Sequence, residues 1–128
     1  MSWSEARPGR IAVVTGGASG IGEACARQFV AQGYAAVVVD RDLAKAQAVA
    51  ARIGGRAHAA DVADAKQTED CAQSIERDCG PVDVLVNSAG IIQVPVRPHE
   101  LPISAWDEVV RVDQRGTYVA SLAFARHM

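Results

Sequence analysis

Residues 11–22 read IAVVTGGASGIG, an apolar run followed by a glycine-rich turn. The run 11–14 is short and rich in β-branched residues, which is typical of a buried strand. Apolar residues at helical spacing follow the turn, at Ile21, Ala24, Cys25 and Phe29. This stretch therefore predicts a strand that passes through a tight turn into the start of a helix.

The same alternation continues along the rest of the chain. Apolar runs at 35–39, 56–60 and 82–86 predict further strands, and helical patterns separate them. Strands without regular polar alternation, each followed by a helix, are typical of a parallel sheet covered on both faces. We therefore expect an α/β fold, a Rossmann-type doubly wound parallel sheet truncated after four strands in the order 3-2-1-4, with helices on both faces.

Capping residues set the expected ends of the later helices. Asp42 is expected to cap a helix that runs to residue 53, where Gly54 stops it. Asp64 is expected to cap the next helix, which Gly80 ends. Ser104 is expected to start the last helix, which would run close to the end of the chain. The Pro-rich stretch 91–103 is the one long segment without a predicted element.

Composition places the chain among ordinary globular domains. Its 128 residues suffice for one domain, expected to span 1–128 with residues 1–9 flexible. A net charge of −2 and 5% aromatic residues give no indication of nucleic-acid binding. No apolar run approaches the ~20 residues of a membrane span, and the N-terminus lacks a signal-peptide core. We therefore expect a cytoplasmic protein with no nucleic-acid or membrane partner.

The cysteines and histidines show no spacing typical of metal or redox sites. Cys25, Cys71 and Cys79 form no C-x-x-C and are expected to be half-buried residues of helices. The histidines are scattered along the chain. We therefore expect no metal site.

The glycines of the turn suggest a ligand. A helix N-terminus offers unpaired N–H groups and a partial positive charge, which suit a pyrophosphate. Gly16 would permit the tight turn, Gly20 a close approach of backbone and phosphates, and Gly22 close packing of the helix on the strand. The alternative is a structural turn without a ligand. The strand before the glycines, the helix after them and an acidic residue downstream favour a dinucleotide site.

Asp40 ends the second predicted strand, about twenty residues beyond the glycines. A carboxylate there can accept hydrogen bonds from the hydroxyls of an adenosine ribose and would repel a 2′-phosphate. The alternative is a solvated residue or a helix cap. Arg41 favours the extra phosphate, but in extended backbone it would point away from Asp40. We therefore expect NAD as the cofactor, with NADP less favoured.

Three ordered motifs carry a family resemblance. Residues 15–22 match T-G-x-x-x-G-x-G in full, residues 87–90 read NSAG where the pattern is N-N-A-G, and Asp61-Val62 follows the third predicted strand. On these motifs, which span essentially the whole chain, the sequence resembles the short-chain dehydrogenase/reductase family. The resemblance implies an oxidoreductase that moves a hydride between NAD(P) and an alcohol or a ketone, with Asp61 beside the adenine.

The resemblance also implies roles for the matched residues. Asn87 would line the cofactor together with Ala89 and Gly90 and would steady the sheet. Ile21 would lie near the nicotinamide ribose and Ser19 near the phosphates, and the threonine that opens the motif would tie the glycine turn to residues 87–90. The expected cofactor-binding residues are Thr15, Gly16, Ser19, Gly20, Ile21, Gly22, Asp40, Arg41, Asp61, Val62, Asn87, Ala89 and Gly90.

Two positions depart from the family pattern. Ser88 replaces the second Asn and keeps a hydrogen-bonding side chain. Asp113 follows Val112 where the family usually has Val-Asn, and that Asn supports a water-linked proton relay. Asp113 could hold a water but adds a negative charge. The alternative is a polar residue at an irregularity of the helix.

The residues that the resemblance implies for catalysis are not found in these 128 residues. The family uses a Tyr with a Lys four residues later, which lowers the Tyr pKa, and an upstream Ser. Val38 follows Tyr34 at that spacing, and Leu122 follows Tyr118. We therefore expect no catalytic residue in this chain, and no activity from it alone.

Three interpretations follow from this pattern. The first is the dinucleotide-binding half of an enzyme. The second is a non-catalytic NAD-binding module or partner subunit. The third is an interaction domain that has lost cofactor binding, which the intact glycine turn and Asp40 disfavour.

The fourth predicted strand and the last helix suggest self-association. Residues 82–86 would form an apolar edge of the sheet with no neighbouring strand, and such an edge invites pairing with another chain. Val109, Val119, Leu122 and Phe124 are candidates for an uncovered apolar helix face. We expect a homo-oligomer or a self-associating chain.

Overall fold

The computed structural model describes residues 10–128, so the expectation that residues 1–9 are flexible lies outside the described part. Strands and helices alternate as the sequence predicts. The strands are β1 (Ile11–Thr15), β2 (Ala35–Asp40), β3 (Arg56–Ala59) and β4 (Val84–Asn87). The helical elements are α1 (Gly20–Ala31), α2 (Leu43–Ile53), α3 (Ala65–Cys79), a 3₁₀ turn (Pro98–Glu100), α4 (Ile103–Val109), a π-helix (Val110–Arg115) and α5 (Gly116–Ala125).

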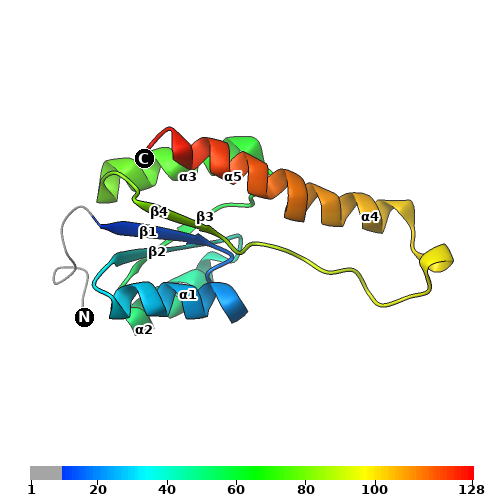
Figure 1. Ribbon diagram of the computed structural model, residues 1–128, viewed down its shortest axis with the longest axis horizontal. Coiled ribbons are helices and arrows are strands. Elements are labelled where there is room, and N and C mark those ends of the chain that lie inside the picture. The colour runs from blue at the N-terminus through cyan, green and yellow to red at the C-terminus, as the bar shows by residue number, and fades with distance from the viewer. Residues whose placement is uncertain (1–9) are drawn as a thin grey trace.

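The four strands form one parallel sheet in the order β3-β2-β1-β4. Helices α1 and α2 cover one face, and α3 and α5 cover the other (Figure 1). The predicted Rossmann-type fold class, strand order and two-sided helix cover are confirmed. The carboxyl ends of β1, β2 and β4 are in register, because Thr15 pairs with Val39 on one side and with Asn87 on the other.

Both faces of the sheet are apolar, which explains why the strands lack polar alternation. Val13 and Val37 lie in a buried cluster with Phe124 of α5. Val14 and Val38, one residue further along, lie in the second cluster with the apolar residues of α2. Each fully buried Val stabilises the fold by about 1.5–3 kcal/mol relative to exposure. The runs 11–14 and 35–39 therefore have to be apolar at every position.

Most of the predicted helix ends are confirmed. The Asp42 carboxylate accepts a hydrogen bond from the Lys45 N–H (3.1 Å), and Gly54 closes α2 in the left-handed conformation. Asp64 accepts from the Gln67 N–H (3.0 Å), and Gly80 ends α3. These side chains satisfy backbone donors that the first helical turn leaves unpaired.

The predicted start of the last helix at Ser104 is wrong. Pro102 occupies the N-cap position, and its carbonyl accepts from the N–H groups of Ala105 (3.0 Å) and Trp106 (3.3 Å). Proline already has the extended backbone of a cap residue and has no N–H to leave unpaired. Ser104 consequently lies inside the first turn. The helical run then continues through α4, the π-helix and α5 to Ala125, near the chain end as expected.

The expected apolar face of the last helix needs one correction. Phe124 is buried in the core against α3 and the sheet rather than uncovered. Val109 and Val119 are half-buried, and Leu122 is 43% exposed. The exposed face of α5 is therefore made by Tyr118 and Leu122.

The cysteines lie in helices and are buried or half-buried, as expected. Among residues 10–128, we find no helix with the length and apolarity that crossing a bilayer requires.

Candidate functional site

The turn between β1 and α1 is built around Gly16. Its backbone has a φ of +62°, a conformation that favours glycine. A Cβ at this position would lie 2.6 Å from the Ala89 backbone, so only glycine lets the turn approach the segment after β4. Gly20, with a φ of +54°, begins α1, and a Cβ there would meet no atom within 4 Å. The start of α1 therefore faces open space.

Gly22 packs against the turn rather than against the strand itself. A Cβ at Gly22 would lie 2.2 Å from the Gly16 carbonyl oxygen. Gly22 thus permits close packing, as expected, but the expected contact surface is corrected from the strand to the glycine turn.

Thr15 connects the glycine turn to the segment after β4. The Thr15 side chain is almost fully buried, and its Oγ1 accepts from the N–H groups of Ser88 and Ala89, both at 3.3 Å. The same hydroxyl donates to the Val86 carbonyl oxygen (3.4 Å). This confirms the expected tie between the first motif and residues 87–90, and it accounts for a polar residue at the end of a buried strand.

Asp40 lies at the carboxyl end of β2, beside the glycine turn. Its carboxylate accepts from the Ala18 N–H (3.3 Å) and from the Asp42 N–H (3.1 Å). These bonds use one lone pair of each oxygen and leave acceptor capacity for a ligand hydroxyl. Arg41 also contributes to the lining of the pocket described next, and the expected direction of its side chain away from Asp40 stays a prediction.

An open pocket of about 470 Å³ lies along the carboxyl ends of the strands. It collects ten of the expected cofactor-binding residues: Gly16, Ser19, Gly20, Ile21, Asp40, Arg41, Asp61, Val62, Ala89 and Gly90. Three expected residues do not line it: Thr15, Gly22 and Asn87. Sequence reasoning missed the lining residues Ala18, Asp42, Lys45, Ala60, Ser88, Ile91 and Val112.

Asn87 is directed to a helix instead of the pocket. Its Nδ2 donates to Ser121 Oγ (3.1 Å), and that hydroxyl donates to the Thr117 carbonyl of α5 (2.7 Å). Asn87 thus links the end of β4 to α5. This contact agrees with a role in steadying the sheet, and its role toward a cofactor stays a prediction.

The rim of the pocket after β3 is a tight turn. Asp61 Oδ1 accepts from the Ala63 N–H (2.9 Å), and the Asp61 carbonyl accepts from Thr68 Oγ1 (3.2 Å). Val62 is nearly buried beneath this turn. One carboxylate oxygen of Asp61 thus fixes the turn that places Asp61 and Val62 on the pocket.

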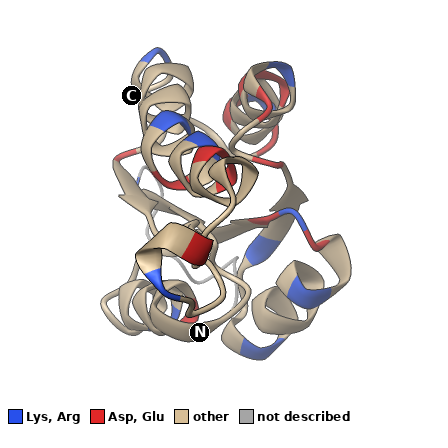
Figure 2. Cartoon of the chain, turned by 90° about the vertical axis from the view of Figure 1, so that its right-hand side faces the viewer, with Lys and Arg blue, Asp and Glu red and all other residues tan. Residues whose placement is uncertain are grey.

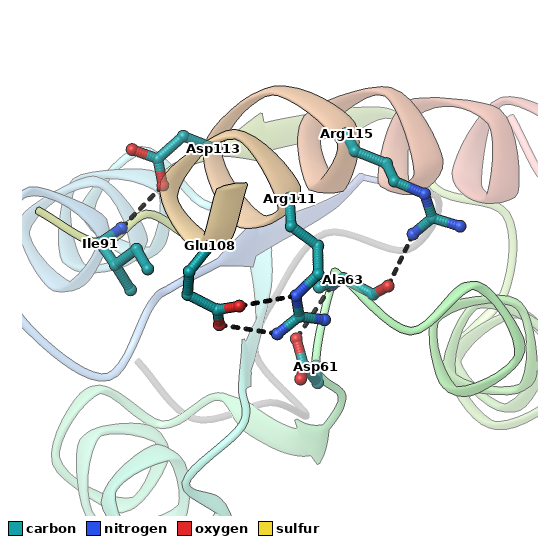
Figure 3. Close-up of polar contacts among 7 residues, drawn as sticks. All are labelled: Asp61, Ala63, Ile91, Glu108, Arg111, Asp113 and Arg115. Atoms are coloured by element: carbon teal, nitrogen blue, oxygen red, sulfur yellow. Dashed lines mark hydrogen bonds and ion pairs between the residues drawn. The ribbon is translucent and has the colours of Figure 1, made fainter. Parts of the chain in front are cut away.

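The π-helix contributes Val112 to the pocket lining, and its side chains contact the segments after β3 and β4 (Figure 3). Asp113 Oδ1 accepts from the Ile91 N–H (2.8 Å), and Arg115 Nη1 donates to the Ala63 carbonyl (2.7 Å). Asp113 lies in the π-helix, so the helix is irregular at this residue, and the expected role of Asp113 in holding a water stays a prediction. Its side chain holds a backbone N–H at the rim after β4.

Glu108 and Arg111 form a two-fold hydrogen-bonded ion pair beside Asp61 (Figure 3). The hydrogen bond from Arg111 lowers the pKa of Glu108, and the same bond raises the pKa of Arg111, with a further contribution from the Asp61 charge. In the cartoon of Figure 2, Lys and Arg positions are interspersed with Asp and Glu positions along the elements.

The chemistry of the pocket lining suits a dinucleotide. The start of α1 at Gly20 lies beside open space, and a helix N-terminus offers unpaired N–H groups that suit a pyrophosphate. Asp40 offers acceptor capacity next to that position, and the pocket lies at the crevice where such sheets bind ligands. This fold and pocket define a nucleotide-binding α/β protein of the Rossmann type.

Comparison with known proteins gives the family. The sequence model described as short chain dehydrogenase matches residues 10–128. D-threitol dehydrogenase from Mycolicibacterium smegmatis is 36% identical over 125 residues, which cover 94% of this chain and 48% of that protein. 2,3-Dihydro-2,3-dihydroxybenzoate dehydrogenase from Bacillus subtilis is 37% identical over 125 residues, which again cover 94% of this chain and 48% of that protein. The chain belongs to the short chain dehydrogenase family of oxidoreductases, whose members use NAD(P).

A solved structure shows the same arrangement. The 3-ketoacyl-(acyl-carrier-protein) reductase from Brucella melitensis, complexed with NADH, superposes with a TM-score of 0.89 at 35% identity. The superposition covers 94% of this chain and 50% of that one. The chain thus spans about half the length of the relatives it matches.

Proposed function

We propose that this chain is the dinucleotide-binding part of an oxidoreductase that transfers a hydride between NAD and an alcohol or ketone. The observation that carries the proposal is the convergence of the glycine turn and Asp40 on one pocket. When bound there, the nicotinamide would accept or supply the hydride. The residues of this chain would bind and orient the cofactor.

Each half of the cofactor has a proposed place along the strand ends. The pyrophosphate would lie over Gly20 at the start of α1, where the helix dipole favours negative charge. The adenosine ribose would donate hydrogen bonds to Asp40, and the adenine would lie near Asp61, because β3 is next to β2 in the sheet. The other half of the dinucleotide would lie toward β4, beside Ala89 and Gly90.

Asp40 supports NAD rather than NADP. A 2′-phosphate would bring a second anion against its carboxylate, whereas a 2′-hydroxyl can donate to it. A hydrogen bond to a charged group is worth about 1.5–3 kcal/mol, which corresponds to a preference of about tenfold or more. Arg41, which would favour a 2′-phosphate, also lines the pocket. The proposed preference for NAD therefore depends on Asp40 alone.

The proton transfer that accompanies hydride transfer needs residues outside these 128. The Tyr and Lys implied by the family are not found at their spacing here, and we propose that the longer protein provides them. The test is a titration of the full-length protein with NADH and NADPH, followed by an assay with alcohols and ketones. Tighter NADH binding with turnover supports the proposal. Tighter NADPH binding overturns the cofactor assignment, and NADH binding without turnover of any substrate favours the non-catalytic module.

A further inference from the structure

The two rims of the pocket belong to strands that do not touch. One rim, Asp61–Ala63, follows β3, and the other, Gly90–Ile91, follows β4. In the sheet order β3-β2-β1-β4 these are the two edge strands, with β2 and β1 between them. The sheet itself does not fix the width of the pocket opening. That width depends on the loops that follow the two edge strands.

The π-helix Val110–Arg115 contacts both rims. Asp113 accepts from the Ile91 N–H at 2.8 Å on the β4 side, and Arg115 donates to the Ala63 carbonyl at 2.7 Å on the β3 side. Val112, the residue directly before Asp113, is buried and lines the pocket. Figure 3 shows Asp113 and Arg115 reaching in different directions from this one segment.

Close packing reinforces the contact on the β3 side. A Cβ on Gly116 would lie 2.7 Å from Val62 Cγ2 and 3.3 Å from Val62 Cβ. The backbone at the start of α5 therefore lies directly against a residue of the pocket. Arg115 and Gly116 together hold the Asp61–Ala63 turn, one by a hydrogen bond to its carbonyl and the other by contact with Val62.

The local geometry explains why the segment is irregular. A π-turn contains one more residue than an α-turn, so it changes the direction in which successive side chains project. That change accompanies the placement of Asp113 and Arg115 on opposite rims with Val112 in the pocket. Such turns are frequent at functional sites.

We propose that the π-helix is a brace that sets the spacing of the pocket rims, with Arg115 as a positioning residue for the adenosine end of a bound dinucleotide. The proposal rests on the proposed function, because it takes the pocket as the dinucleotide site. Arg115 acts through the Ala63 carbonyl on the turn that carries Asp61 and Val62. Asp113 acts on the other rim.

The test measures binding of NADH and of AMP, which carries only the adenosine half, to the full-length protein. Arg115→Ala is expected to weaken both ligands about three- to tenfold, the effect of one charged hydrogen bond. Asp113→Ala is expected to weaken NADH while AMP binding stays within about twofold, because the altered rim is at the other end of the pocket. Arg126→Ala is the matched control, since this arginine lies just after α5 and pairs with Glu69 instead of the rim.

The pattern across the two ligands separates positioning from a general loss of stability. Binding is compared below the melting temperature of every variant, where all of them are folded. If Arg115→Ala lowers the melting temperature but binds AMP as tightly as the unmodified protein, the role of Arg115 is merely structural and the proposal is overturned. If the unmodified protein bound neither ligand, both the proposed function and the proposed role of the π-helix would be contradicted. If it bound both and only the Arg115→Ala effect were missing, the brace alone would fall.

Discussion

Gly22 does not line the pocket, but the absence of a side chain there lets α1 pack against the glycine turn that does. Gly22→Ala would place a Cβ 2.2 Å from the Gly16 carbonyl, against backbone that cannot rotate away. We expect the free energy of unfolding to fall by about 1–3 kcal/mol, as for other overpacked positions, and NADH affinity to fall more than about tenfold. Urea unfolding and an NADH titration would measure the two effects.

A control on the same helix separates stability from binding. Ala24→Gly, at an exposed position of α1, should cost about 1 kcal/mol through helix propensity alone and leave NADH affinity unchanged. Equal losses of NADH affinity in both variants would show that the loss in Gly22→Ala does not come from a distorted glycine turn.

In the proposed assignment Asp40 sets the cofactor preference, so removing its charge should change that preference. Asp40→Asn keeps an acceptor for the ribose hydroxyl and removes the repulsion of a 2′-phosphate. The ratio of NADH to NADPH affinity should fall about tenfold. Competition titrations would measure it, with Asp70→Asn, which removes an exposed charge on α3 paired with Lys66, as the control. An unchanged ratio would place the selectivity elsewhere.

Sequence reasoning at this scale succeeded where a residue follows a strand directly. Gly16, Asp40 and Asp61 could be assigned to one site because the carboxyl ends of parallel strands meet at the same edge. Val112 could not be assigned to the site from the sequence. It lies in a helical segment that follows no strand directly, and only the folded structure brings it to the pocket. Asn87 was expected at the pocket wall, yet the nearby Ser121 hydroxyl holds its amide on α5.

At the scale of elements, α3 shows how burial affects a titrating group. The Cys71 thiol lies in the core, and burial raises its pKa from 9.0 to about 12. A raised pKa contributes stability that is fully present below 9.0 and is lost as the pH rises from there toward 12. Above pH 9.0, the free energy of unfolding should fall with pH more steeply than in a Cys71→Ala variant, by up to about 1.4 kcal/mol per pH unit.

Urea unfolding of both proteins under reducing conditions, at one pH below 9.0 and one above, would check this expectation. The cost of Cys71→Ala should be larger at the lower pH. A cost that does not change with pH would mean that the thiol is not titrating from a buried state.

Element boundaries followed the sequence where a side chain makes the cap. Asp42 and Asp64 accept the bonds that their spacing predicts. Ser104 does not, because Pro102 already supplies the cap backbone two residues earlier. The π-helix was not predictable from periodicity, since its irregularity accompanies contacts with Ile91 and Ala63, segments far away in the sequence.

At the scale of the whole molecule, β4 is an edge strand and α5 has exposed apolar side chains. Val84, Leu85 and Val86 are only half-buried, and Tyr118 and Leu122 are 65% and 43% exposed. We expect the isolated 128-residue chain to self-associate at tens of micromolar, and Leu122→Glu to reduce the association. Light scattering would measure both. A monodisperse monomer for the unmodified chain would contradict this expectation.

The fold as a whole was predictable because it depends on local order. Each strand passes to a helix through a recognisable turn or cap, and right-handed crossovers leave few arrangements of parallel strands. The burial of Phe124 was not predictable from the pattern alone. It depends on α5 packing against α3, and these helices are separated in sequence by β4 and the long segment after it.

The predictions on cofactor affinity all depend on the proposed binding of NAD in the pocket at the strand ends. The most direct measurement is a crystal structure of the protein grown with NADH. We predict the pyrophosphate over Gly20 at the start of α1, the adenosine ribose within hydrogen-bonding distance of Asp40, and the other half of the cofactor beside Gly90. Density for the dinucleotide at a different surface, with the Asp40 carboxylate contacting only the protein, would contradict the account.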